Sequence, residues 1–243
     1  QIAIDDTLSP ADLVLALAQE FALLEPFGCE NPVPLFLTKD LLLRDITPVG
    51  GGRHTRLTLC RGDWRITAMY FGTAPETLPY RTGDRVDVVY QIDINEFMNR
   101  TSVQMLITDM DFSEEVYQEL EQQREIYGRI CRGEAVECAD MLPDRQDFAD
   151  LYRCLRDRCG ERETHVTDTA LSLKLRMPLY RLLLALDILA EMRLITCSAQ
   201  KGALCIALLH ATDKVDLEKS PTLCALRAKY ISEETPGKDE TYG

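Results

Sequence analysis

Arginines gather in one short stretch of the sequence, where they outnumber the acidic residues. Cationic side chains neutralise phosphates, and aromatic rings beside them stack on bases when a protein holds a single nucleic-acid strand. The whole chain of 243 residues carries a formal net charge of −13 at pH 7, which opposes non-specific binding to DNA. Any nucleic-acid surface must therefore be local, or must borrow charge from another part of a larger protein. The stretch contains Arg44, Arg53, Arg56, Arg61 and Arg65, with only Asp45 and Asp63 among them.

The candidate binding residues combine these cations with aromatic and polar side chains. His54 and Arg56 are two residues apart, so a strand places both on one face. Trp64 and Tyr70 offer stacking surfaces, although a lone Trp in a small barrel can instead fill the core. The turn at 95–100 could clamp a backbone, but a hairpin turn with a positive φ at Asn explains it equally well. The predicted nucleic-acid-binding residues are Arg53, His54, Arg56, Trp64, Arg65, Tyr70, Asn95 and Arg100.

The pattern around these residues predicts strands. Residues 56–59 and 65–69 alternate polar and apolar side chains, which is the pattern expected for a sheet with one solvent-exposed face. Glycine-containing turns separate the segments. Five short strands with tight turns favour a small Greek-key barrel of the OB type, and other small barrels fit the pattern nearly as well. The predicted strands cover residues 35–45, 53–60, 64–71, 85–92 and 102–112.

The rest of the chain has helical periodicity, which makes the expected fold class α+β. A helix is predicted at 9–24, before the barrel. After the barrel, helices and a β-hairpin follow one another in the order of a winged helix. The helix at 178–191 is mostly apolar, so we expect it to bind a partner or cap the fold rather than read DNA. The expected divisions are a leading helix and linker at 1–33, an OB-like barrel at 34–112, a helix and connection at 113–143, a winged-helix-like domain at 144–231 and a disordered tail at 232–243.

Several classes of chemistry lack their sequence signals. The nine cysteines include no pair with CxxC spacing, so we expect free thiols and no metal site. The three histidines are far apart, and no HExxH motif or nucleophile elbow occurs. These observations predict no catalytic residues and leave little support for an independent small-molecule enzyme. No apolar run is long enough to span a bilayer, so we expect a cytoplasmic protein without a membrane partner.

Residues 23–36, LLEPFGCENPVPLF, resemble a pattern found in bacterial RecJ exonucleases, LxPFGxGNPxPxF. In that family the pattern links the DHHA1 domain to the OB domain. Glu30 stands where the family usually has Gly. The resemblance continues through His54, the strand at 57–59 and the segment at 83–90, and it covers residues 1–112. Residues 147–209 resemble, more loosely, the extra C-terminal domain of Firmicutes-type RecJ proteins.

This resemblance implies a non-catalytic C-terminal part of a 5′→3′ single-stranded-DNA exonuclease. RecJ catalysis needs a DHH motif and companion aspartates that hold two Mn²⁺ or Mg²⁺ ions, and this sequence contains no DHH motif. We therefore expect the chain to belong to a longer nuclease of DNA repair and recombination, to guide single-stranded DNA and to hydrolyse none alone. The alternative is a protein-interaction module that docks a repair partner, such as a single-strand-binding protein or a helicase.

Overall fold

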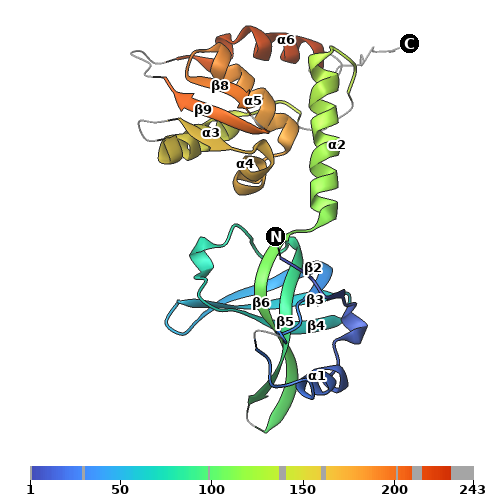
Figure 1. Ribbon diagram of the computed structural model, residues 1–243. Coiled ribbons are helices and arrows are strands. Elements are labelled where there is room, and N and C mark those ends of the chain that lie inside the picture. Colours follow the sequence, from blue (N-terminus) through green and yellow to red (C-terminus); the bar gives the residue numbers. More distant parts are fainter. Residues whose placement is uncertain are drawn as a thin grey trace, which may run out of the picture. The chain divides into compact units, whose positions relative to one another are not determined.

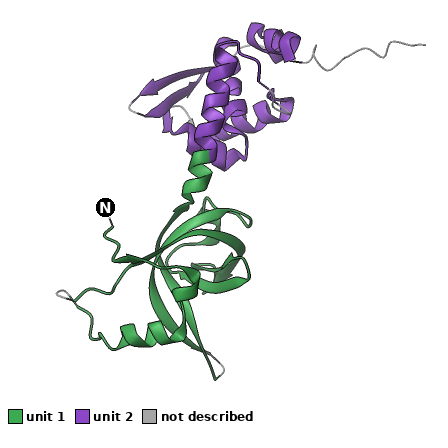
Figure 2. Ribbon diagram, turned by 90° about the vertical axis from the view of Figure 1, so that its right-hand side faces the viewer, with its two compact units in different colours: residues 1–118 green, residues 119–243 purple. Residues whose placement is uncertain are grey.

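The computed structural model describes residues 2–28, 31–97, 99–136, 141–159, 163–200, 202–209 and 215–230. The chain divides into two compact units, residues 1–118 and 119–243 (Figure 2). The predicted tail at 232–243 lies outside the described residues. The predicted α+β class is confirmed. None of the helices in the described part of the chain is long and apolar enough to pass through a bilayer.

The first unit is built on a closed β-barrel (Figure 1). Its strands follow the order β1-β2-β3-β4-β6-β5, and a further pairing between β2 and β5 closes the sheet. β4 and β6 run parallel, whereas β3 is antiparallel to both of its neighbours. This is the predicted OB-like barrel. The strands are β1 (Asp6–Thr7), β2 (Phe36–Val49), β3 (His54–Arg61), β4 (Trp64–Tyr70), β5 (Arg85–Phe97) and β6 (Arg100–Phe112).

Barrel closure depends on a bend in β2. Its first part pairs with β5 and its second part with β3, and the two pairings meet at Leu42. Two register shifts interrupt these pairings, and bulges of this kind bend a strand. Asp40 lies in the first shift with a φ of 56°. Its backbone N–H donates to Asp87 over 2.8 Å, and its carboxylate accepts from Arg85, so side chains of β5 stabilise the bend.

The barrel core contains one buried polar contact. Thr38 and Tyr90 are fully buried, and their hydroxyl oxygens lie 2.8 Å apart. The Thr38 hydroxyl also donates to the carbonyl of Leu8 over 3.0 Å. Because Thr38 has one hydroxyl proton, Tyr90 is the donor between the two side chains. Burial raises the pKa of Tyr90 to about 12, which keeps this donor protonated at neutral pH.

A short helix, α1 (Leu15–Ala22), lies against β5 and β6. The Phe21 ring lies 4.9 Å from the Phe36 ring, measured between centroids. The prediction of one helix over 9–24 is wrong at its start, because Pro10–Asp12 forms a separate 3-10 turn. The Asp12 carboxylate accepts bonds from the backbone and hydroxyl of Ser9, so the expected capping residues close that turn instead of starting α1.

The second unit combines helices with a three-stranded antiparallel sheet of order β7-β9-β8. α5 is its most buried helix, with eight of 13 residues buried. Strand β7 was not predicted from the sequence. The elements after the barrel are α2 (Glu114–Cys131), α3 (Arg145–Cys159), β7 (Thr164–Val166), α4 (Asp168–Leu175), α5 (Leu179–Glu191), β8 (Ile195–Gln200), β9 (Ala203–Leu208) and α6 (Pro221–Tyr230).

The buried contact between Thr38 and Tyr90 predicts unequal losses of barrel stability. Tyr90→Phe leaves the Thr38 hydroxyl bonded to Leu8, so we expect the free energy of unfolding to fall by about 1 kcal/mol. Thr38→Val leaves the Tyr90 hydroxyl and the Leu8 carbonyl without this partner, so we expect a loss of about 2–3 kcal/mol. Urea unfolding followed by the fluorescence of Trp64, the one tryptophan of the chain, measures both losses. A larger loss for Tyr90→Phe would contradict the assigned direction of these bonds.

Candidate nucleic-acid interface

The candidate interface is the outer face of β3 and β4. Strand alternation separates this face from the core: the pair Leu57 and Ala68 is fully buried, whereas the neighbouring Arg56 is exposed. Arg65 and Thr67 of β4 are exposed on the same side as Arg56. We define the β3–β4 face as the outward residues His54, Arg56 and Thr58 of β3 and Arg65, Thr67 and Met69 of β4.

A glycine turn places Arg53 at the end of this face. Gly50, Gly51 and Gly52 all have positive φ, which only glycine adopts readily. A Cβ atom on Gly50 would lie 2.8 Å from Cδ2 of His54, so a larger residue at this position would force the imidazole to shift. The Arg53 side chain donates from Nε to the Gly50 carbonyl over 3.2 Å. Arg53 and His54 therefore lie at the junction between the glycine turn and β3.

His54 connects this turn to the end of β4. Its Nδ1 accepts a hydrogen bond of 2.8 Å from the backbone N–H of Gly72. This bond requires a lone pair on Nδ1, so the neutral ring carries its proton on Nε2. The His54 ring also lies edge-on to Phe71, with centroids 5.3 Å apart. The contacts of His54 therefore hold Phe71 at the end of the β3–β4 face where Arg53 lies.

Phe71 is the aromatic residue that sequence reasoning did not select as a stacking surface. It is 56% exposed although it is a large apolar side chain. Its contact with His54 places it at the Arg53 end of the β3–β4 face. The sequence signal is weak, since a Phe-Gly pair after a strand is also an ordinary turn.

The two predicted stacking residues, Trp64 and Tyr70, point to the opposite side of the sheet from Arg56 and Arg65. Tyr70 lies opposite the buried Thr55, and Trp64 lies opposite Arg61. By strand alternation both share the inward side of Ile66, and both are partly exposed. Burial raises the pKa of the Tyr70 hydroxyl. The structure therefore separates Trp64 and Tyr70 from Arg56 and Arg65.

The outer surface continues from β4 to the long β5–β6 hairpin. Thr67 pairs with Gln104 across β4 and β6, and Gln104 pairs with Asp93 of β5. The Gln104 amide donates to the Asp93 carboxylate over 2.6 Å. Asn95 follows on the same side of β5, while Arg100 begins β6 at the hairpin tip. Asn99 adopts the positive φ that the turn needs, at 58°.

The arginines of the interface have no acidic partners among the described residues. Arg53, Arg56 and Arg65 make no ion pair with any residue that the structure describes. Some arginines elsewhere are paired: Arg124 donates to Asp168, and Arg181 donates to Asp147. The three interface guanidinium groups can therefore bind phosphates without first breaking an ion pair.

Helix α5 of the second unit is not cationic. Arg181 is the cationic residue of α5, and Asp147 already binds it. Asp187, the acidic residue in the middle of α5, accepts a 2.6 Å hydrogen bond from the Tyr127 hydroxyl. Burial raises the pKa of Asp187. The described part of α5 therefore offers no free cation to a phosphate backbone.

Comparison with known proteins assigns the barrel. Residues 4–109 match the family described as the RecJ OB domain. Over 104 residues the chain is 28% identical to the single-stranded-DNA-specific exonuclease RecJ of Bacillus subtilis (strain 168). The matched segment covers 42% of this chain and 13% of that protein, so the chain spans only a small part of the relative's length.

Two solved structures are also similar. RecJ in complex with Mn²⁺ from Thermus thermophilus is 21% identical, with a TM-score of 0.38, and the match covers 51% of this chain and 20% of that chain. The second single-stranded DNA binding protein of Mycobacterium smegmatis is 18% identical, with a TM-score of 0.29, covering 32% of this chain and 84% of that chain. The family match and the strand order together identify residues 4–109 as an OB domain of the RecJ type.

Proposed function

We propose that the first unit binds single-stranded DNA along the β3–β4 face. The observation that carries this proposal is the grouping of Arg53, Arg56 and Arg65, which make no ion pair with the residues that the structure describes, with the exposed Phe71. OB domains hold single strands with cations that bind phosphates and aromatic rings that stack on bases. Here Arg56 and Arg65 lie on the face itself, and Arg53 and Phe71 lie at one end of it.

The spacing of the arginines along the barrel suits an extended single strand of DNA. Arg65 pairs with Cys60, which lies four residues after Arg56 on β3. At a rise of about 3.3 Å per residue, Arg56 and Arg65 are roughly 13 Å apart along the direction of the β-strands. Arg53 extends the row beyond Arg56, at the turn. A row of this length can contact several successive phosphates of a single strand, and OB domains bind about 4–16 nucleotides.

In the full-length protein, this unit would guide single-stranded DNA to catalytic domains outside the chain. The relative from Bacillus subtilis is named a single-stranded-DNA-specific exonuclease, which supports this role. The sequence contains no DHH motif, so the Mn²⁺ or Mg²⁺ ions of a RecJ-type reaction would be bound elsewhere. We also propose that the parent protein degrades single strands in the 5′→3′ direction in DNA repair and recombination. Asn95 and Arg100 would clamp the backbone of the strand at the β5–β6 hairpin.

A second candidate function applies to the second unit, which we propose to be a winged-helix domain that docks a protein partner. The order α3-β7-α4-α5-β8-β9 and the sheet order β7-β9-β8 support this fold. The helix in the recognition position, α5, is mostly buried, and its Arg181 is bound to Asp147. These contacts favour a protein partner, such as a single-strand-binding protein or a helicase, over a DNA duplex.

The arginine row predicts a change in the salt dependence of DNA binding. Fluorescence anisotropy of a labelled single-stranded oligonucleotide, titrated at several salt concentrations, measures the slope of log affinity against log salt. Each of Arg53→Ala, Arg56→Ala and Arg65→Ala should weaken binding and reduce the magnitude of that slope by about 0.7, the contribution of one phosphate contact.

The matched control is Arg156→Ala, an exposed arginine on α3 of the other unit. It removes the same charge and should change neither affinity nor slope. If Arg156→Ala weakened binding as much as the interface variants, net charge rather than the β3–β4 face would explain the effect. An intact chain without measurable oligonucleotide affinity that still retained a repair protein would favour the partner-docking function.

Phe71 predicts a loss of affinity that does not depend on salt. Phe71→Leu keeps an apolar side chain but removes the ring, so a lost stack should cost about 1–3 kcal/mol, or about 5- to 150-fold in affinity. The salt slope should stay unchanged because no phosphate contact is lost. The same anisotropy titration measures both quantities, and Trp64 fluorescence during urea unfolding checks that the barrel remains folded. Wild-type affinity in a folded Phe71→Leu protein would remove Phe71 from the interface.

A further inference from the structure

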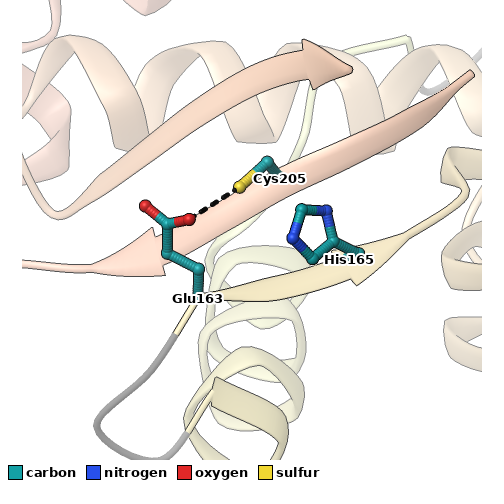
Figure 3. A group of neighbouring side chains, drawn as sticks. All are labelled: Glu163, His165 and Cys205. Atoms are coloured by element: carbon teal, nitrogen blue, oxygen red, sulfur yellow. Dashed lines mark hydrogen bonds between the residues drawn. The ribbon is translucent and has the colours of Figure 1, made fainter. Parts of the chain in front are cut away.

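Three side chains of metal-binding type converge on the sheet of the second unit. They are Glu163, which precedes β7, His165 on β7 and Cys205 on β9 (Figure 3). One ligand atom from each residue lies within 4.8 Å of the other two. The Cys205 thiol donates to the Glu163 carboxylate over 3.2 Å, the contact drawn as a dashed line in Figure 3.

The strand pairing explains why these residues meet. His165 and Cys205 are direct partners across the antiparallel strands β7 and β9. Direct partners have Cβ atoms about 4.5–5.5 Å apart on one face of the sheet. The adjacent residues Val166 and Ile206 are buried, so alternation directs the His165 and Cys205 side chains to the other face of the sheet, where Cys205 is also buried and His165 is exposed. Glu163, two residues before His165, shares that side.

The ligand types match a zinc site. Zn²⁺ binds cysteine sulfur at about 2.3 Å and histidine nitrogen or carboxylate oxygen at about 2.0–2.2 Å. Those bond lengths place tetrahedral ligand atoms roughly 3.3–3.8 Å apart. The widest pair therefore needs a contraction of up to about 1.5 Å, whereas the Cys205 sulfur and the Glu163 oxygen are already 3.2 Å apart. Glu163 and His165 are exposed and can change rotamer, whereas the Cys205 side chain is buried on β9.

We propose that Glu163, His165 and Cys205 bind one zinc ion. The hydrogen bond between Cys205 and Glu163 shows that the sulfur and the carboxylate oxygen already approach each other. On binding, the metal would lie to the side of the line between these two atoms, and the thiol proton would leave to solvent. Three protein ligands leave a fourth position for water or for another ligand. The ion would link the segment before β7 to β9 and so stabilise the edge of the sheet.

Zinc binding by the intact chain tests this proposal. The protein is treated with a chelator, kept reduced and titrated with Zn²⁺ in a calorimeter, and with Co²⁺ in a spectrophotometer. We expect one zinc equivalent and a thiolate-to-cobalt charge-transfer band. Cys205→Ala and His165→Ala should each weaken zinc binding by more than about 100-fold, since even outer-shell changes cost 10- to 100-fold. Zn²⁺ should also raise the melting temperature of the wild type but not of His165→Ala.

The matched control is Cys224→Ala, which removes an exposed thiol from the same unit but outside the cluster. It should keep wild-type zinc affinity and the cobalt band. Zinc binding that survives Cys205→Ala, or that is lost in Cys224→Ala, would overturn the proposal because the ion would then lie elsewhere. A wild-type protein without zinc binding would overturn it as well. If Cys205→Ala failed to fold, the exposed His165→Ala variant would decide between these outcomes.

Discussion

The two-residue alternation of the barrel strands is the constraint on which the interface depends. Leu57 and Ala68 fill the closed barrel without any solvent exposure, so Arg56, which precedes Leu57 in β3, must point outward. Closure itself depends on the bend of β2 at Asp40, whose backbone and carboxylate are bound by side chains of β5. A straight β2 could pair with β3 or β5 along its length, but a bent one pairs with both and turns the sheet into a barrel.

The position of the charges follows from the same constraint. In a chain with a net charge of −13, most cations could be neutralised by neighbouring acids. On the β3–β4 face the strands instead present Thr58 and Thr67 between the two arginine positions, so no carboxylate lies directly across from Arg56 or Arg65. The nearby Asp93 is occupied by Gln104. Local sequence order thus keeps one cationic face available within an acidic protein.

Sequence periodicity predicted the barrel but only part of the candidate site. Alternation in 56–59 and 65–69 was sufficient to place Arg56 and Arg65 outward. It could not place Phe71, whose exposure depends on the turn that His54 holds through Gly72. It also underestimated the β5–β6 hairpin, because Asp93, Asn95 and Glu96 have low strand propensity and pairing with β6 overrides that preference. The break between the 3-10 turn and α1 was missed because the capping residues of 9–12 also suit a longer helix.

The proposed zinc ligands could not be predicted from the sequence either, and strand alternation again explains where they lie. Residues 163 and 165 are separated from Cys205 by some 40 positions, and no local motif connects them. Only the antiparallel register of β7 and β9 makes His165 and Cys205 partners. In both units, every second side chain of a strand packs into the core, so one side of the sheet is buried. The residues able to bind a ligand are therefore those of the other side, where strands distant in sequence bring them together.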